Sequence, residues 1–170
     1  MTCIKRWKLT NEAETHNGLQ YHDGLVADPL PFNDDPSASC CPGGIYFAGR
    51  DTLAFIEGMT WAREVSLPPN ARVVLDPSSP EKWRADRVIL GPRVPIAQAI
   101  PDILAAGADL HADDDQALCW AAERGHLPVV QALLAAGADL HANDDQALCW
   151  AANCGHTEIV KLLQNVGWKP

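Results

Sequence analysis

Two consecutive stretches of the chain are nearly the same sequence: residues 105–134 read AAGADLHADDDQALCWAAERGHLPVVQALL, and residues 135–164 read AAGADLHANDDQALCWAANCGHTEIVKLLQ. Aligned without a gap, they are identical at 21 of 30 positions. A period of this length is typical of repeat proteins, in which each unit packs on its neighbour. The upstream fragment ILAAGADL at 103–110 predicts a degenerate unit before the two full ones.

Each unit predicts two helices. The first helix is expected at 116–124 and the second at 127–136, because apolar residues recur on one side of each at helical spacing. Gly125 and Gly137 follow them and can adopt the left-handed conformation that ends a helix. We expect the carboxylate of Asp115 to accept a hydrogen bond from the first turn of the first helix. One such helix pair is too small to bury its own apolar side, so neighbouring units must pack together.

Three motifs of the first unit resemble ankyrin repeats: the turn G-A-D-(apolar)-x-A, the helix A-L-x-x-A-A-x-x-G-H and the helix V-V-x-x-L-L. The resemblance implies a stack of about two and a half repeats within residues 93–170. A degenerate half-repeat is expected at 94–106, and full repeats near 107–136 and 137–167. Compact units of this kind are similar to those of ankyrin proteins in giant DNA viruses of amoebae. The resemblance also implies a function in protein–protein interaction.

Two departures from the family pattern concern the start of each repeat. The family unit has about 33 residues, whereas three residues are missing here after His111-Ala112, so we expect a truncated β-hairpin finger. The family tetrapeptide T-P-L-H is replaced by Gln-Ala-Leu-Cys at 116–119 and at 146–149. In both copies the cysteine lies beside alanines, and we expect it on the buried side of its helix.

Residues 1–92 show no such period and predict a small, β-rich α+β module. Short apolar runs bounded by proline or glycine indicate strands. The expected strands are 3–9, 44–48, 61–67, 71–75 and 85–90, with a short hairpin around 19–21. Residues 51–58 predict a two-turn helix with Asp51 as its N-terminal cap. The simplest role of this module is to cover the apolar start of the repeat stack near Ile100 and Ile103.

The module also resembles a domain that precedes ankyrin stacks in some of those viral proteins. The resemblance lies in Gly-Leu at 24–25, Pro-Phe at 31–32, CPGGIYF at 41–47 and KWRADRVILGP at 82–92. It covers most of the N-terminal half and implies no activity for it.

A second interpretation compares the module with ADP-ribosyltransferases. His16-x-Gly18 and G-I-Y-F-A at 44–48 occur in the order of two motifs of those enzymes, in which a histidine holds the nicotinamide ribose and a tyrosine stacks on nicotinamide. The resemblance would make Tyr46 the stacking residue and Glu64 the nearest substitute for the catalytic glutamate. The histidine and glycine are not adjacent here, however, and a tyrosine in an apolar strand is more often part of a core.

The charge of the chain is uneven. The net charge is −9, and residues 94–170 carry three basic side chains against ten acidic ones. Affinity for nucleic acid comes from Lys and Arg that displace counterions from phosphates, so the repeats are not expected to bind it. A protein partner with a basic surface fits this charge better.

Composition indicates a soluble, cytosolic protein without a cofactor. The chain has no run of about 18 apolar residues that could cross a membrane, and it starts with charged residues where a secretion signal needs an apolar segment. Its six cysteines are then expected to be reduced. We considered a zinc site made from His16, His22, Cys3, Cys40 and Cys41, but the spacing Cys-x-x-Cys that favours zinc is missing. No metal is therefore expected.

Partner binding is expected on the surface of the repeats. Trp120 and its copy Trp150 occupy a position that tends to face the concave groove of ankyrin stacks, and large aromatic side chains concentrate interface energy. Alternatively, both tryptophans pack on neighbouring helices. The other candidates differ between the copies or lie in acidic turns: Glu123, Arg124, Asn153, Asp113 and Asp114. Freely varying solvent positions and solvated, helix-capping turns would look the same.

The sequence favours a non-catalytic adaptor that binds a protein on the concave face of the stack. It contains no Ser-His-Asp set, phosphate-binding glycine loop or HExxH pattern. The alternative is an NAD-using transferase module with an ankyrin targeting arm.

Overall fold

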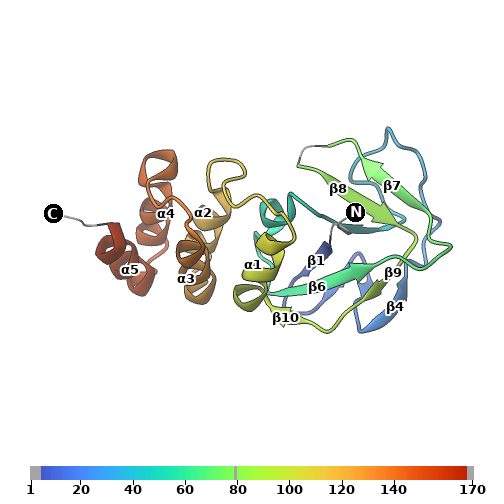
Figure 1. Ribbon diagram of the computed structural model, residues 1–170, viewed down its shortest axis with the longest axis horizontal. Helices are drawn as coiled ribbons and strands as arrows, with labels where there is room; N and C mark the ends of the chain where they lie inside the picture. Colours follow the sequence, from blue (N-terminus) through green and yellow to red (C-terminus); the bar gives the residue numbers. More distant parts are fainter. Residues whose placement is uncertain (1–4, 79, 168–170) are drawn as a thin grey trace. The chain divides into compact units, whose positions relative to one another are not determined.

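The computed structural model describes residues 5–78 and 80–167. The chain divides into two compact units. The first comprises the chain up to Thr52 together with Met59–Ala108, and the second comprises Leu53–Gly58 together with the chain from Asp109 onward. The first unit consists mostly of strands, as predicted, and the second consists of helices (Figure 1).

Antiparallel strands build the first unit. The larger sheet has the order β1-β6-β9-β4, and β10 also pairs with β6. Its strands are β1 Arg6–Thr10, β4 Gly24–Ala27, β6 Trp61–Ser66, β9 Arg87–Leu90 and β10 Val94–Pro95. A three-stranded sheet has the order β5-β8-β7, with bounds β5 Ile45–Phe47, β8 Lys82–Ala85 and β7 Val73–Asp76. A hairpin pairs β2 Thr15–His16 with β3 Leu19–Gln20.

Both sheets contribute side chains to one core. Along β9 the residues alternate between exposed and buried, with Val88 and Leu90 buried, as expected of a strand with one face on a core. The core cluster comprises Tyr21, Val26, Ile45, Phe47, Val65, Ala85, Val88 and Leu90. Helix α1, Ile96–Ala105, also belongs to this unit and lies against β6 and β10, with Ile100 and Ile103 fully buried.

Three sequence-based expectations for residues 1–92 are wrong. The predicted strand 85–90 is divided between β8 and β9 at Asp86, whose main chain bonds to Arg72 and Asp28, so the chain passes there from one sheet to the other. The predicted helix 51–58 is a single 3₁₀ turn, η1 Thr52–Phe55, and the Asp51 carboxylate accepts the main-chain N–H of Glu81 instead of capping it.

The third concerns strand β4, which is absent from the expected strands because its surroundings are rich in glycine, aspartate and proline. The predicted strands 44–48, 61–67 and 71–75 correspond to β5, β6 and β7. Strand 3–9 corresponds to β1, but its first residues lie outside the described part of the chain.

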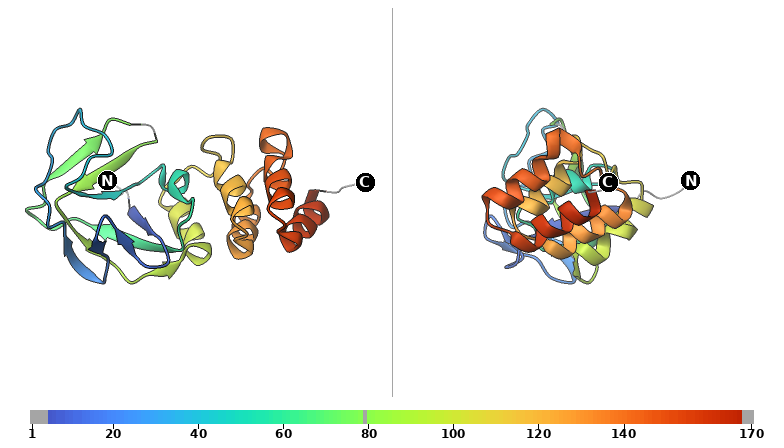
Figure 2. Two further views of the ribbon diagram at one scale, coloured as in Figure 1. Left: turned by 180° about the vertical axis from the view of Figure 1, so that it is seen from behind. Right: turned by 90° about the vertical axis from the view of Figure 1, so that its left-hand side faces the viewer.

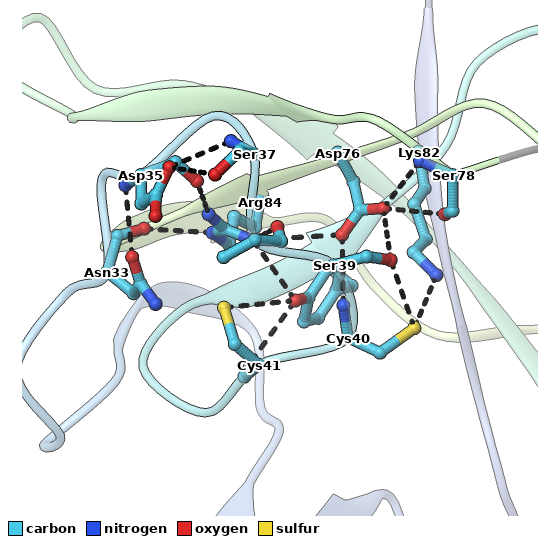
Figure 3. Close-up of polar contacts among 12 residues, drawn as sticks. Asn33, Asp35, Ser37, Ser39, Cys40, Cys41, Asp76, Ser78, Lys82 and Arg84 are labelled. Carbon is cyan, nitrogen blue, oxygen red and sulfur yellow. Dashed lines mark hydrogen bonds and ion pairs between the residues drawn. The ribbon is translucent and has the colours of Figure 1, made fainter.

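A fully buried arginine fixes the long loop before β5. The Arg84 guanidinium donates hydrogen bonds to the carbonyl oxygens of Asn33 at 2.9 Å, Ala38 at 2.7 Å and Asp35 at 2.6 Å (Figure 3). It lies 3.7 Å from the carboxylate of Asp76, which is also buried. A charge can remain in such a place only when it is paired and hydrogen-bonded.

The Asp76 carboxylate completes this arrangement. Its oxygens accept hydrogen bonds from the hydroxyl of Ser39, the hydroxyl and N–H of Ser78, and the N–H of Cys40. Burial by itself would raise the pKa of Asp76, but these hydrogen bonds more than offset it and hold the pKa well below its usual range. Arg84 and Asp76 together therefore hold the segment from Asn33 to Cys40 on the sheet.

Replacing Arg84 with methionine should destabilise the protein by about 3–5 kcal/mol, because it leaves the Asp76 carboxylate buried without its cation. Urea denaturation followed by circular dichroism measures the loss. Arg87→Met is the matched control, since Arg87 is half exposed in its ion pair with Asp86 and should cost less than about 1 kcal/mol. Equal midpoints for the two variants would contradict the assigned role of Arg84.

Two helix pairs make up the repeats of the second unit. Their bounds are α2 Gln116–Glu123, α3 Leu127–Ala136, α4 Ala142–Asn153 and α5 Thr157–Gly167. Within each pair the helices pack on each other, α2 lies beside α4, and α3 lies beside α5 (Figures 1 and 2). Gly125 and Gly137 both have positive φ, as predicted for residues that end helices. Helix α3 has the predicted bounds, and α2 ends one residue earlier than predicted.

The same residues are buried in the first repeat and accessible in the second. Leu118, Cys119, Ala122 and Val130 are buried, whereas their counterparts Leu148 and Val160 are half-buried and Cys149 and Ala152 are exposed. The difference identifies the side of a repeat that the next repeat covers. It also corrects the expectation for Cys149, because burial of this cysteine depends on a following repeat rather than on its own helix.

A further copy of residues 138–167, joined directly after Gly167, should cover this side of the second repeat. We expect a higher melting temperature, because stability in such stacks rises with each interface. We also expect thiol-specific labelling of Cys149 to slow to the rate of Cys119. Exposed Cys154, which ends α4 on its surface, serves as the internal reference. Unchanged labelling of Cys149 would show that the copy does not stack.

Candidate partner-binding surface

An unusual backbone conformation precedes α2 and the regular part of α4. Asp113, Asp114 and Asp115 have φ values of 51°, 55° and 57°, and Asn143–Asp145 have 52°, 56° and 61°. Left-handed backbone is costly for most residues but least so for Asp and Asn. The turns therefore consist of Asp and Asn only, and the segment that would form a β-hairpin finger is reduced to a left-handed turn. The regular helical part of α4 starts after Asp145, as α2 starts after Asp115.

Asp115 does not cap α2, contrary to our prediction. A helix cap requires an extended backbone, and the left-handed conformation of Asp115 leaves its side chain without a bond to the first turn. Its buried carboxylate instead lies 3.0 Å from Nδ1 of His111 and accepts the N–H of Asp139 at 3.1 Å. Because Asp139 belongs to the next repeat, this carboxylate joins the two repeats.

Two further hydrogen bonds among the described residues cross between the repeats. The Asn143 side chain donates to the Asp114 carbonyl at 3.0 Å, and Nε2 of His156 donates to the Glu123 carbonyl at 2.8 Å. Asp115 and His156 recur at the same positions of the other repeat, but the repeat pattern alone does not reveal these links, because each side chain finds its partner only in the neighbouring repeat.

The two tryptophans lie on equivalent faces of neighbouring helices. Gln116, Trp120 and Glu123 are spaced i, i+4 and i+7, so they share one side of α2, and all three are half-buried. Gln146, Trp150 and Asn153 share the corresponding side of α4. Neither tryptophan is among the buried residues of its helix, which are small or aliphatic.

The remaining predicted residues lie at the two ends of α2. Asp113 and Asp114 are exposed at its N-terminal end, and among the described residues their carboxylates have no hydrogen bond or ion pair. Glu123 and Arg124 lie at the other end, about 12 Å away for a helix of this length. Arg124 is already paired with Glu57 of the same unit at 2.7 Å. The structure thus gathers these residues along one helix and its flanking turn, not into one cluster.

The residues compared with ADP-ribosyltransferases lie in three different sheets. His16 is exposed on β2, Tyr46 is on β5, and Glu64 is on β6 and pairs with Lys5. The Tyr46 hydroxyl donates to the carbonyl of Cys41 at 3.1 Å. Among the described residues no hydrogen bond or ion pair joins any two of the three.

The structure adds two observations on other candidate sites. Within residues 5–78 and 80–167, no three His, Cys, Asp or Glu side chains come together as a metal site would require. Cys3, one of the potential ligands we considered, lies outside these residues. No helix in the same ranges is both long and apolar enough to cross a membrane.

Comparison with known proteins supports the assignment of the repeats and also finds similarity outside them. A family profile for ankyrin repeats, in three copies, matches residues 97–169. Two ankyrin repeat proteins of Acanthamoeba polyphaga mimivirus are 38% and 34% identical over 131 and 137 residues, covering 72% and 75% of this chain. An uncharacterized protein of the same virus is 32% identical over 133 residues, covering 75% of this chain and 95% of that protein. No solved structure gives a significant match.

The chain belongs to the ankyrin-repeat family. Within that family it is similar to proteins of a giant DNA virus of amoebae, and it spans 42% and 65% of the length of the two ankyrin repeat proteins that it matches. These alignments are longer than the repeat segment 97–169, so they extend into the β-rich module. At least part of the module is therefore similar in those relatives.

Asp115→Ala should lower the free energy of unfolding by about 1–3 kcal/mol, because it removes the hydrogen bond between a charged carboxylate and the Asp139 N–H at the junction of the repeats. Asp145→Ala is the matched control. Asp145 has the same left-handed backbone and an equivalent histidine at 2.6 Å, but among the described residues no following repeat donates to it. Chemical denaturation of both variants measures the difference, and equal losses would contradict the inter-repeat role.

The penalty of Asp115→Ala should also depend on pH. The hydrogen bond and ion pair with Asp115 raise the pKa of His111 above its usual value. Their contribution is therefore complete below about pH 6 and is lost as pH rises through the folded-state pKa. The change should be small because His111 is largely exposed. Denaturation of both proteins below pH 6 and again well above the folded-state pKa of His111 tests this. A larger penalty at the higher pH would contradict it.

Proposed function

We propose that this protein is a non-catalytic adaptor whose repeats bind a partner protein across the α2–α4 face. The ankyrin-repeat family supports the general function, since stacks of this kind present extended surfaces for binding. The observation that carries the proposal is the pair of half-buried tryptophans, Trp120 and Trp150, at equivalent positions of adjacent helices.

The tryptophans suit an interface better than a purely structural role. Contacts between the repeats are supplied by small and aliphatic residues such as Ala122 and Leu118, which are buried. A half-exposed indole still has apolar surface to bury and an N–H that a partner can accept. Two such side chains, on the neighbouring helices α2 and α4, provide the large aromatic anchors in which binding energy concentrates.

The residues that differ between the repeats support recognition of one specific partner. Glu123 and Arg124 of the first repeat are replaced by Asn153 and Cys154 in the second, next to the tryptophan faces. The buried residues of the first helix, from Ala117 to Ala122, are the same in both copies. Each repeat therefore offers the partner the same aromatic anchor with a different polar neighbour.

Charge favours a partner with a basic surface. Among the described residues of the second unit, the basic side chains are Arg124 and Lys161, and Arg124 is already paired with Glu57. The acidic side chains in and beside the turns include Asp109, Asp113, Asp114, Asp139 and Asp144. Such a surface would repel nucleic acid and would attract Lys and Arg of a protein.

Trp120→Ala and Trp150→Ala should each weaken binding of the partner by at least about tenfold, as expected for central aromatic anchors. Affinity capture from the cells that make the protein identifies the partner, and calorimetry with the purified pair gives the dissociation constants. Gln131→Ala, on the exposed side of α3, is the control and should bind normally.

The same measurement at low and high salt tests the charge argument, because screening should weaken binding to a basic surface. Full-strength binding by both tryptophan variants would refute the proposed face. Binding that does not change with salt would refute the basic partner while leaving the face intact.

A further inference from the structure

The buried Arg84–Asp76 pair of the first unit presents a cysteine to a lysine at the surface. Ser39, Cys40 and Cys41 directly follow the segment that Arg84 holds. The Asp76 carboxylate accepts hydrogen bonds from the Cys40 N–H at 3.2 Å and from the Ser39 hydroxyl at 2.8 Å (Figure 3). These two hydrogen bonds fix the position of Cys40. Its side chain does not contribute to the core, since Cys40 is exposed.

Two donors converge on the sulfur of Cys40. The Lys82 ammonium lies 3.0 Å from Sγ, and the Ser39 hydroxyl lies 3.6 Å from it (Figure 3). Lys82 comes from β8, where its ammonium also lies over the Tyr46 ring at 5.4 Å from the ring centre. The Lys82 hydrogen bond, aided by Ser39, lowers the pKa of Cys40, and the Asp76 charge opposes this only in part.

The backbone at Cys40 supports a constrained thiol. Its φ of 50° is left-handed, which is uncommon for residues other than Gly, Asn and Asp. Such conformations persist only when the surrounding contacts hold them, and here five hydrogen bonds from Arg84 and to Asp76 fix the loop. The other exposed cysteines, Cys149 and Cys154, lie on and at the end of α4 and have no lysine at their sulfur among the described residues.

We propose that Cys40 is a modification site, a reactive thiolate held by Lys82 that peroxide oxidises to sulfenic acid. The sulfur attacks one peroxide oxygen, so that an S–O bond forms as the O–O bond breaks. The electron pair leaves on the second oxygen, which takes a proton from the Lys82 ammonium and departs as water or an alcohol. Sulfur is oxidised by two electrons and the peroxide is reduced, and Lys82 recovers its proton from solvent.

The neighbouring Cys41 is poorly placed to resolve this product. Adjacent Cα atoms are about 3.8 Å apart, which is shorter than the roughly 4.4–6.8 Å that disulfides span. The Cys41 sulfur instead lies 3.8 Å from the Tyr46 hydroxyl. The sulfenic acid therefore remains available to an external thiol.

The test compares thiols within one full-length molecule. At neutral pH, iodoacetamide should alkylate Cys40 about tenfold faster than Cys149, as a partly ionised thiol would. After hydrogen peroxide, dimedone should label Cys40 and leave Cys149 unlabelled, with both sites quantified by peptide mass spectrometry. Lys82→Gln should remove the advantage of Cys40, whereas Lys82→Arg should keep most of it.

Unchanged Cys149 alkylation and an unchanged circular dichroism spectrum in Lys82→Gln show that the fold is intact. A Cys40 rate equal to that of Cys149 in the native protein would overturn the proposal. So would a Cys40 rate that Lys82→Gln leaves unchanged, or alkylation without dimedone labelling after peroxide.

Discussion

The helices of the second unit depend on packing between neighbouring repeats. A pair of short helices cannot cover its own apolar side, so each repeat is stable only with another against it. The contrast between Cys119, which is buried, and Cys149, which is exposed, marks the side of a repeat that the following repeat covers. The same residue at the same position of the unit has different surroundings because only the first copy has a following repeat in the described chain.

The shortened turn has its own cost, and the polar links between repeats offset part of it. Three consecutive left-handed residues are unfavourable even for Asp and Asn. In return, the conformation directs the Asp115 carboxylate toward the main chain of Asp139, and Asn143 reaches back to the preceding turn. Residues that would cap a helix in another setting here connect two repeats.

Periodicity was sufficient to predict the repeats, because their spacing reflects burial on one side of each helix. It could not predict the role of Asp115, since a helix cap and a left-handed turn accept the same residue type. In the first unit, the division of 85–90 at Asp86 and the buried place of Arg84 depend on partners far along the chain. The tryptophan positions were found from the repeat alone, but their use in binding remains a prediction.

The segment Leu53–Gly58 interrupts the first unit and belongs to the second, where Glu57 meets Arg124. The chain therefore passes from one unit to the other three times instead of once. Genetic exchange at a single junction near residue 108 would separate the repeats from this segment and leave Arg124 without its carboxylate.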